Sequence, residues 1–173
     1  MRLFLTITLF CLCLLTFICC RSHRKPIQST KPKVSLNKES EQQSNQKVNK
    51  VISTARSYIG TPYKFGGTSR AGMDCSGLMI LSFKEVGLSL PRTSQEQSSI
   101  GKTINFSEIK PGDLVFFVNK KGDSQITHVG LVSAVKGSRD VKFIHSSTKL
   151  GVVESDLYVS YYENILIKAT RVL

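Results

Sequence analysis

Hydrophobic residues recur at helical spacing in two segments of the first half of the chain. In the first segment they lie three or four positions apart, at Val48, Val51, Ile52 and Ala55. Gly60 follows as a stop signal. The second segment opens at Asp74, a residue type that favours the N-cap of a helix, and runs to about residue 86, before Gly87. The pattern therefore predicts two helices, joined by a glycine-rich loop over residues 60–72.

The second half of the chain changes to short apolar runs that are typical of β-strands. These predicted strands cover residues 113–118, 128–135, 142–147, 151–155 and 165–172. The connections between them are short, which favours antiparallel pairing. Helices that precede a set of strands predict an α+β fold. We expect N-terminal helices packed on a mostly antiparallel sheet of five to six strands.

The first 20 residues form a separate segment with its own pattern. Arg2 precedes an apolar run that ends at Cys20, which is typical of an export signal or a membrane anchor. Cysteines at the end of such a run suggest a lipoprotein, and we predict lipidation at Cys20, with Cys19 as the alternative. A plain signal peptide and an uncleaved anchor are competing interpretations. We expect an exported protein that is attached to a membrane by this segment or its lipid.

Residues 21–47 are rich in Ser, Gln, Asn and Lys and contain no aromatic residue. This composition buries too little apolar surface to order itself, so it predicts a flexible polar tether. The folded domain is expected to begin near residue 48 and to extend to residue 173.

The net charge of +12 raises the question of an anionic partner. More than half of that excess lies in residues 1–50, while the other 123 residues hold fifteen basic and ten acidic side chains. The domain has no zinc-finger spacing, no aromatic RNA-binding signature and no long basic stripe. We therefore expect no nucleic-acid partner.

Cysteine usage singles out one thiol in the predicted domain. Four of the five cysteines lie in the first 20 residues, so Cys75 has no disulfide partner within the domain. A helix N-terminus at Cys75 would lower the pKa of its thiol. His128 and His145 lie on neighbouring predicted strands, from which both could face Cys75. An inert core cysteine with ordinary strand histidines, or a mononuclear zinc site, would use the same residues. These residues alone leave the three interpretations open.

Six short motifs, which follow one another along the chain, favour one of these three interpretations. They are GTPYKFGG, MDCSGL, LPRTSQEQ, KPGDLVFF, ITHVGLV and FIHSS. Together they resemble the NlpC-type family of bacterial peptidoglycan peptidases, from about residue 48 to the C-terminus. The resemblance implies a papain-like α+β fold with a nucleophile at a helix N-terminus. It further implies hydrolysis of peptide bonds in cell-wall stem peptides, without a cofactor or a metal.

The resemblance also implies roles for individual residues. Cys75 matches the family nucleophile, His128 its base, and His145 the residue that orients the base. Four further positions match residues at the oxyanion or substrate site: Tyr63, Asp74, Ser76 and Arg92. The expected reaction proceeds through a thiolate and an acyl-enzyme.

Two alternatives use the same scaffold. One is a catalytically inactive peptidoglycan-binding module, and the other is an acyl or amide transferase. Whichever of these functions holds, we expect a monomer in the bacterial cell envelope, on the periplasmic or the cell-surface side, whose partners are peptidoglycan peptides.

Overall fold

A computed structural model describes residues 33–173 of the chain, with side chains from residue 38. The predicted export segment with Cys19 and Cys20, and tether residues 21–32, lie outside the described residues. Within residues 33–173, no helix combines the length and the apolar character that a membrane crossing requires.

A six-stranded antiparallel sheet forms the centre of the domain, in the order β3-β8-β4-β5-β6-β7. Its strands are β3 (Lys102–Thr103), β4 (Leu114–Phe117), β5 (His128–Val135), β6 (Val141–Ser147), β7 (Gly151–Asp156) and β8 (Leu166–Arg171). Five of the six match the predicted strands. The sixth, β3, is only two residues long and has no hydrophobic pattern of its own.

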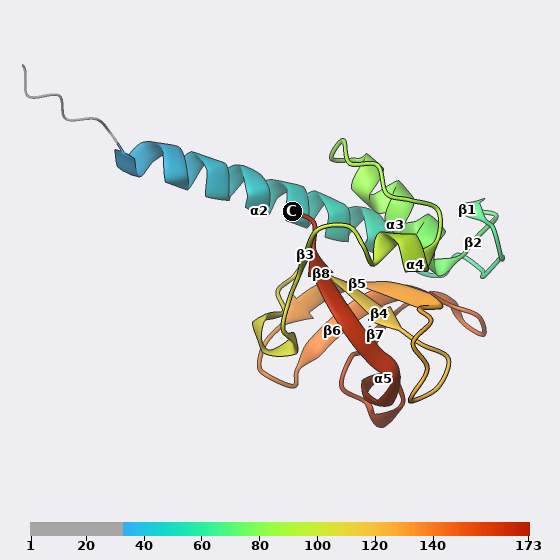
Figure 1. Ribbon diagram of the computed structural model, residues 1–173. Coiled ribbons are helices and arrows are strands. Elements are labelled where there is room, and N and C mark those ends of the chain that lie inside the picture. Colours follow the sequence, from blue (N-terminus) through green and yellow to red (C-terminus); the bar gives the residue numbers. More distant parts are fainter. Residues whose placement is uncertain (1–32) are drawn as a thin grey trace, which may run out of the picture. The chain divides into compact units, whose positions relative to one another are not determined.

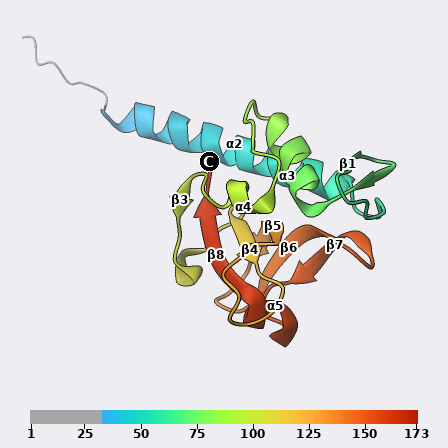
Figure 2. The same cartoon turned by 45° about the vertical axis from the view of Figure 1, so that its right-hand side comes forward.

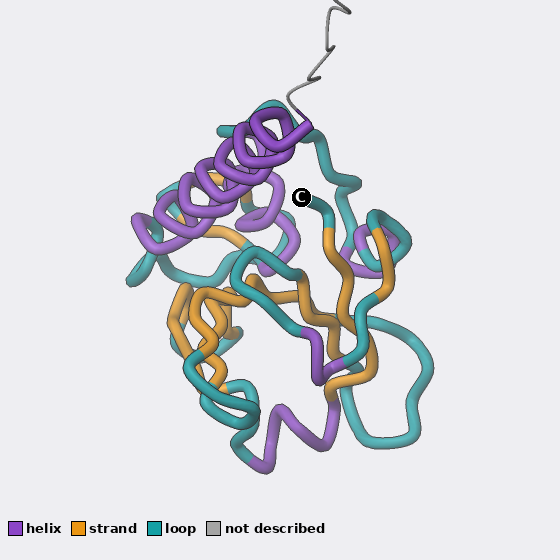
Figure 3. Tube along the Cα trace, turned by 90° about the vertical axis from the view of Figure 1, so that its left-hand side faces the viewer, coloured by secondary structure: helices purple, strands orange, loops and turns teal. Residues whose placement is uncertain are grey.

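The helices precede or interrupt these strands. They are α2 (Lys33–Ser57), α3 (Cys75–Lys84), α4 (Ser94–Gln97), a 3-10 turn at Phe106–Glu108, and α5 (Ser160–Ile165). A small hairpin of β1 (Thr68–Ser69) and β2 (Gly72–Met73) leads into α3. Figures 1 and 2 show α2 and α3 together on one side of the sheet, with α5 at the far end of β8. In Figure 3 the long helix α2 again lies apart from the strands of the central sheet. The predicted α+β arrangement is confirmed.

The sheet is buried on both faces, and β4 shows how its sequence achieves this. Leu114 and Phe116 belong to a core cluster shared with α2 and α3, whereas Val115 and Phe117 belong to a second cluster on the other face. Successive side chains of a strand point to opposite faces, so a strand between two cores must be apolar throughout. The LVFF run of β4 follows from this position.

The first helix is longer than the hydrophobic pattern predicts. It begins at Lys33, so residues 33–47, expected to belong to the flexible tether, are helical. Val51 and Ala55 are fully buried and hold the C-terminal half of α2 in the core. From an anchored half, a helix extends at little cost through Lys, Glu and Gln, which are good helix formers. The mostly exposed side chains of residues 38–47 therefore extend a helix that is packed further along.

Candidate active site

Cys75 is the first residue of α3, and its neighbour Asp74 caps that helix. The Asp74 backbone is extended, and its Oδ1 accepts a hydrogen bond of 2.7 Å from the Gly77 N–H. A carboxylate at this position satisfies one of the free N–H groups at the helix start. The predicted N-cap is confirmed, and the cap fixes where the Cys75 thiol emerges.

A glycine in the first turn of α3 lets the preceding loop approach closely. A Cβ atom on Gly77 would lie 2.3 Å from the Gly67 carbonyl oxygen, a distance that no real side chain tolerates. The same Gly67 oxygen accepts a 3.1 Å hydrogen bond from the Asp74 N–H. The glycine-rich loop thus lies directly against the helix start, which explains the glycine at the end of the DCSG motif.

Asp74 and Arg92 form the charged part of the site. Arg92 donates to both carboxylate oxygens of Asp74, at 3.0 and 2.5 Å, and to the Ser76 hydroxyl at 2.8 Å. Burial of Asp74 opposes its ionisation, but hydrogen bonds from Arg92, Gly77 and Gly66 outweigh it and lower the pKa of Asp74. Asp74 is therefore ionised at neutral pH. The Arg92 side chain remains 42% exposed and can still be reached from solvent.

Tyr63 lies within electrostatic reach of Cys75 and of this charged pair. A β-bridge between Tyr63 and Met73 sets its backbone beside the strand that leads into α3. Burial, followed by the nearby Cys75 and Asp74, raises the pKa of the Tyr63 hydroxyl. The phenol consequently keeps its proton at neutral pH and is a potential hydrogen-bond donor.

The two histidines meet across β5 and β6. His128 Nε2 and His145 Nδ1 lie 2.9 Å apart, at the hydrogen-bond distance expected for two imidazoles. Burial lowers the pKa of His128 to about 4. Burial, and then the neighbouring His128, lowers the pKa of His145 to about 3. Both rings are therefore neutral at physiological pH.

Aromatic side chains enclose His145, which is 1% exposed. The Phe143 ring stacks on it at 4.6 Å with an interplanar angle of 16°, and Tyr162 meets it edge-on at 5.3 Å. Gly130 makes room for this packing, because a Cβ atom there would lie 2.5 Å from the Phe143 ring. The apolar enclosure explains why the imidazole stays neutral.

Two hydroxyl groups hydrogen-bond the far nitrogen of His145. Its Nε2 lies 3.2 Å from Ser155 Oγ of β7 and 3.1 Å from Tyr162 Oη of α5. Neither residue was identified from the sequence. Alternation along β7 would have indicated the face on which Ser155 lies, but α5 has too few residues to leave a periodic pattern.

Direct hydrogen bonds join the two sides of the site. Ser146, the residue after His145, donates from its hydroxyl to the Met73 carbonyl at 2.8 Å, just before Asp74 and Cys75. Gln97 of α4 donates to the Ser76 carbonyl at 3.2 Å and to the Pro91 carbonyl at 2.8 Å. The histidine strands, the helix start and the Arg92 segment are therefore fixed to one another.

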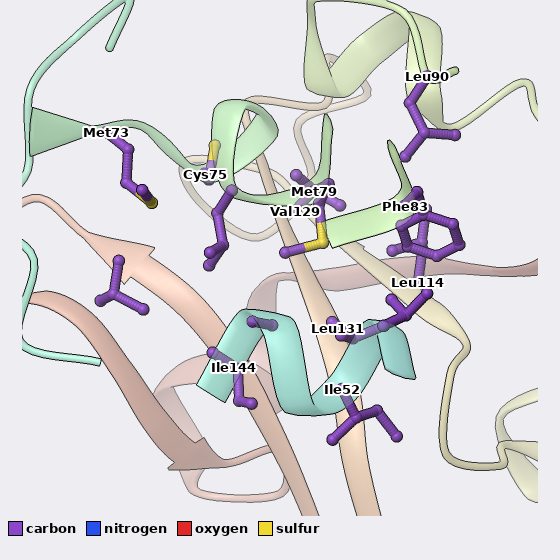
Figure 4. Packing of buried hydrophobic residues seen from close by; sticks show 14 of the residues in the cluster. Ile52, Met73, Cys75, Met79, Phe83, Leu90, Leu114, Val129, Leu131 and Ile144 are labelled. Carbon is purple, nitrogen blue, oxygen red and sulfur yellow. The ribbon is translucent and has the colours of Figure 1, made fainter. Parts of the chain in front are cut away.

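Cys75 lies between the two sides and is 8% exposed. Burial, the largest influence, raises the pKa of its thiol, and hydrogen bonding from the Val129 backbone N–H only partly offsets this. The backbone N–H groups of Cys75 and Ser76 at the helix N-terminus lower this pKa as expected, but burial has the larger effect and the net shift is upward. Figure 4 shows Cys75 at the start of α3, with Met79 and Phe83 further along the helix in the core cluster.

The structure thus brings the predicted site residues to one end of α3. Asp74, Ser76 and Arg92 contact one another, Tyr63 lies within electrostatic reach of Cys75, and His128 contacts His145. Within residues 38–173, no three side chains of His, Cys, Asp or Glu gather in a group that could hold a metal ion. The thiol and the two imidazoles are suited to nucleophilic and general-base chemistry.

Comparison with known proteins identifies relatives. The model of the NlpC/P60 family matches residues 60–171. The probable endopeptidase NlpC of Escherichia coli is 39% identical over 118 residues, covering 68% of this chain and 73% of that protein.

Two solved structures have a similar fold. An NlpC/P60 family protein from Bacillus cereus aligns with a TM-score of 0.67 and 31% identity, covering 73% of this chain and 40% of that one. The peptidoglycan hydrolase RipB from Mycobacterium tuberculosis aligns with a TM-score of 0.62 and 30% identity, covering 76% and 67%. The chain therefore spans less than half of the first structure and about two thirds of the second.

Proposed function

The chain belongs to the NlpC/P60 family, and from this premise we propose that it is a cell-wall hydrolase that cleaves peptide bonds in peptidoglycan stem peptides. The observation that supports a catalytic role is the arrangement around Cys75. A lone thiol at a helix N-terminus lies next to Val129, and the preceding residue, His128, is hydrogen-bonded to a second histidine. The names of NlpC and RipB, an endopeptidase and a peptidoglycan hydrolase, support the same class of reaction.

The proposed mechanism begins from a neutral thiol and a neutral imidazole. His128 uses Nε2 to contact His145, so Nδ1 is the nitrogen that accepts the Cys75 proton. The resulting thiolate attacks a carbonyl carbon of the stem peptide. Because burial raises the pKa of Cys75 and lowers that of His128, the resting pair is not ionised and the proton moves as substrate reacts. Catalytic hydrogen bonds are often long in substrate-free enzymes, so a direct thiol–imidazole bond is not required beforehand.

The other groups have supporting roles in this mechanism. The protonated Tyr63 hydroxyl and the Cys75 backbone N–H donate to the oxyanion of the tetrahedral intermediate. Asp74 and Arg92 offer one negative and one positive partner for the charged ends of a stem peptide. His128 then protonates the leaving amine, and water hydrolyses the thioester to release a free carboxylate.

We further propose that the protein works in the cell envelope, attached through lipidation at Cys20, or alternatively at Cys19. The sequence pattern supports this attachment, and a wall substrate requires export. Mass spectrometry of the N-terminal peptide from membrane-extracted protein tests the proposal. A diacylglyceryl group on Cys20 or Cys19 is expected, and an unmodified peptide that begins at Met1 would contradict it.

Digestion of purified peptidoglycan tests the enzymatic proposal. The full-length protein and its Cys75→Ala variant are incubated with the wall, and the soluble fragments are identified by mass spectrometry. We expect new fragments with free carboxylates from the wild type alone, and their masses identify the bond. New amide or ester products would indicate a transferase. An intact wall, with retained wall binding by both proteins, would indicate a binding module.

A further inference from the structure

His145 differs from an orienting carboxylate because it must itself be held in one tautomer. It contacts His128 through Nδ1, which acts either as an acceptor or as a donor, depending on where the ring proton resides. A carboxylate in this position only accepts when it is ionised. The proposed reaction therefore depends on whatever fixes the proton of His145.

The positions of the ring protons on His128 and His145 follow from the proposed reaction. A base working through His128 Nδ1 must have that nitrogen unprotonated, so the neutral ring holds its proton on Nε2 and donates it to His145. His145 Nδ1 then accepts, and the proton of the neutral His145 must lie on Nε2. This N–H is buried with the rest of the ring and needs an acceptor, because an unpaired buried donor is costly.

Two hydroxyl oxygens lie where that acceptor is needed. Ser155 Oγ is 3.2 Å and Tyr162 Oη is 3.1 Å from His145 Nε2. The two hydroxyls also interact with each other. Burial raises the pKa of the Tyr162 phenol, and a hydrogen bond with Ser155 partly offsets that increase. One hydroxyl comes from β7 and the other from α5, so both elements converge on the same nitrogen.

The Tyr162 ring is held independently of its hydroxyl. It packs against Phe143 at 4.9 Å and Phe117 at 5.7 Å, besides its contact with His145. Removal of the hydroxyl alone should therefore leave the ring in place. This allows the polar contribution to be tested apart from the packing.

We propose that Ser155 and Tyr162 are positioning residues for the reaction: their hydroxyl oxygens accept the Nε2 proton of His145 and so keep its Nδ1 available to accept from His128. The proposal rests on the proposed function, since it assigns the two hydroxyls to the base of that reaction. When neither acceptor is present, the tautomer of His145 with its proton on Nδ1 becomes the more stable one, because that proton can be donated to His128. That proton then faces His128 Nε2, and the His128 proton moves to Nδ1, where it blocks acceptance from Cys75.

Four variants of the full-length protein separate the contributions. Tyr162→Phe and Ser155→Ala each remove one hydroxyl, and the double variant removes both. Tyr161→Phe is the matched control. This neighbouring tyrosine is 64% exposed and its ring packs on Tyr162 at 5.0 Å, so the change keeps that ring contact and removes only a hydroxyl. Each single variant retains one acceptor, so we expect kcat to fall only about 2- to 5-fold. In the double variant we expect kcat to fall about 10- to 100-fold with KM unchanged.

A tautomer measurement accompanies the kinetics. Long-range ¹H–¹⁵N NMR spectra at pH 7 distinguish protonated from unprotonated nitrogens in each imidazole. The wild type is expected to show the proton on Nε2 of both His128 and His145, and the double variant is expected to shift both towards Nδ1. Ser155→Thr, which keeps a hydroxyl, should retain the wild-type tautomers and kcat.

Each outcome decides the proposal. Unchanged tautomers and kcat in the double variant would overturn it, as would a loss of equal size in Tyr161→Phe. If the wild type cleaves no peptidoglycan, the proposed function fails, and the NMR spectra still decide whether the two hydroxyls set the tautomer. If the double variant does not fold, the two single variants decide through the same spectra, in which a partial shift towards Nδ1 supports the proposal and its absence contradicts it.

Discussion

The polar groups on the two sides of Cys75 differ in charge and in burial. The loop side, defined by Tyr63, Asp74, Ser76 and Arg92, contains an ion pair whose arginine is 42% exposed. The strand side, defined by His128, His145, Ser155 and Tyr162, contains neutral imidazoles in an aromatic enclosure. Paired charges at a solvent edge suit the recognition of a charged peptide, whereas burial keeps a base unprotonated. In the proposed function, the charged side would bind substrate and the neutral side would transfer the proton.

The largest effect is expected from removing the base on the strand side. His128→Ala should lower kcat/KM for peptidoglycan cleavage by about 10²- to 10⁴-fold, because the thiol then loses its proton acceptor. Thermal unfolding of the same sample serves as the control for folding. A loss smaller than about tenfold in a folded variant would show that another group accepts the proton.

Removal of one charge on the loop side should affect binding more than chemistry. Asp74→Asn keeps the shape and the cap of α3 but leaves Arg92 without its counter-ion. We expect KM to rise about tenfold with a smaller change in kcat, and the free energy of unfolding to fall by about 1–3 kcal/mol. Steady-state kinetics and urea denaturation measure the two effects. A large fall in kcat at constant KM would place Asp74 in the chemistry instead.

The two sides of Cys75 should lower the free energy of unfolding in different pH ranges as the solution is acidified. The pKa of His145 is about 3 in the folded state, below its ordinary value of 6.5, so the unfolded chain takes up the proton first. The stabilisation that neutral His145 contributes is therefore present above about pH 6.5. As the pH falls from 7 to 5, the free energy of unfolding decreases by about 2 kcal/mol from this residue. His128, with a pKa of about 4, adds to this trend. Urea denaturation at the two pH values measures it, and His145→Gln should remove about 2 kcal/mol of the difference.

Asp74 titrates in another window. Its pKa is lowered from 3.8, so the stability that it contributes is present above pH 3.8 and is lost only at more acidic pH. Asp74→Asn should accordingly keep the wild-type slope between pH 7 and pH 5. A flattened slope in Asp74→Asn, or an unchanged one in His145→Gln, would contradict the assignment of neutral histidines to the strand side.

The smallest effect is expected at an ion pair outside the site. Arg139 makes two hydrogen bonds of 2.8 Å to Glu163 of α5, a geometry similar to that of Arg92 with Asp74, but it is exposed. Exposed pairs gain little from their attraction. Arg139→Ala should leave the unfolding midpoint and kcat unchanged. A measurable loss of kcat would show that this pair helps hold α5, and with it Tyr162, in place.

The sequence predicted the elements whose pattern is local. The five main strands and the start of α3 at Asp74–Cys75 follow from apolar periodicity and cap preference, and the structure confirms them. The first helix was predicted too short, because its exposed half has no apolar pattern and depends on the buried half for its stability.

Some residues around Cys75 were likewise predicted from the sequence, and others were not. Cys75, His128 and His145 were predicted from the cysteine count and from their place in the six motifs that resemble the NlpC-type family. Ser155 and Tyr162 were missed, because their importance comes from a strand register and a short helix that bring them to His145. The raised pKa of Cys75 was also missed, since desolvation depends on how the whole core packs around the thiol.

Intact-protein mass spectrometry of the acyl-enzyme tests the central claim most directly. The full-length protein is mixed with a purified stem peptide, quenched in acid within the first turnovers, and then mapped by peptide fragmentation. We expect a thioester adduct on Cys75 whose mass equals the N-terminal part of the cleaved peptide less one water, and no adduct in Cys75→Ala. Cleavage that proceeds in Cys75→Ala, or an adduct on another residue, would contradict it.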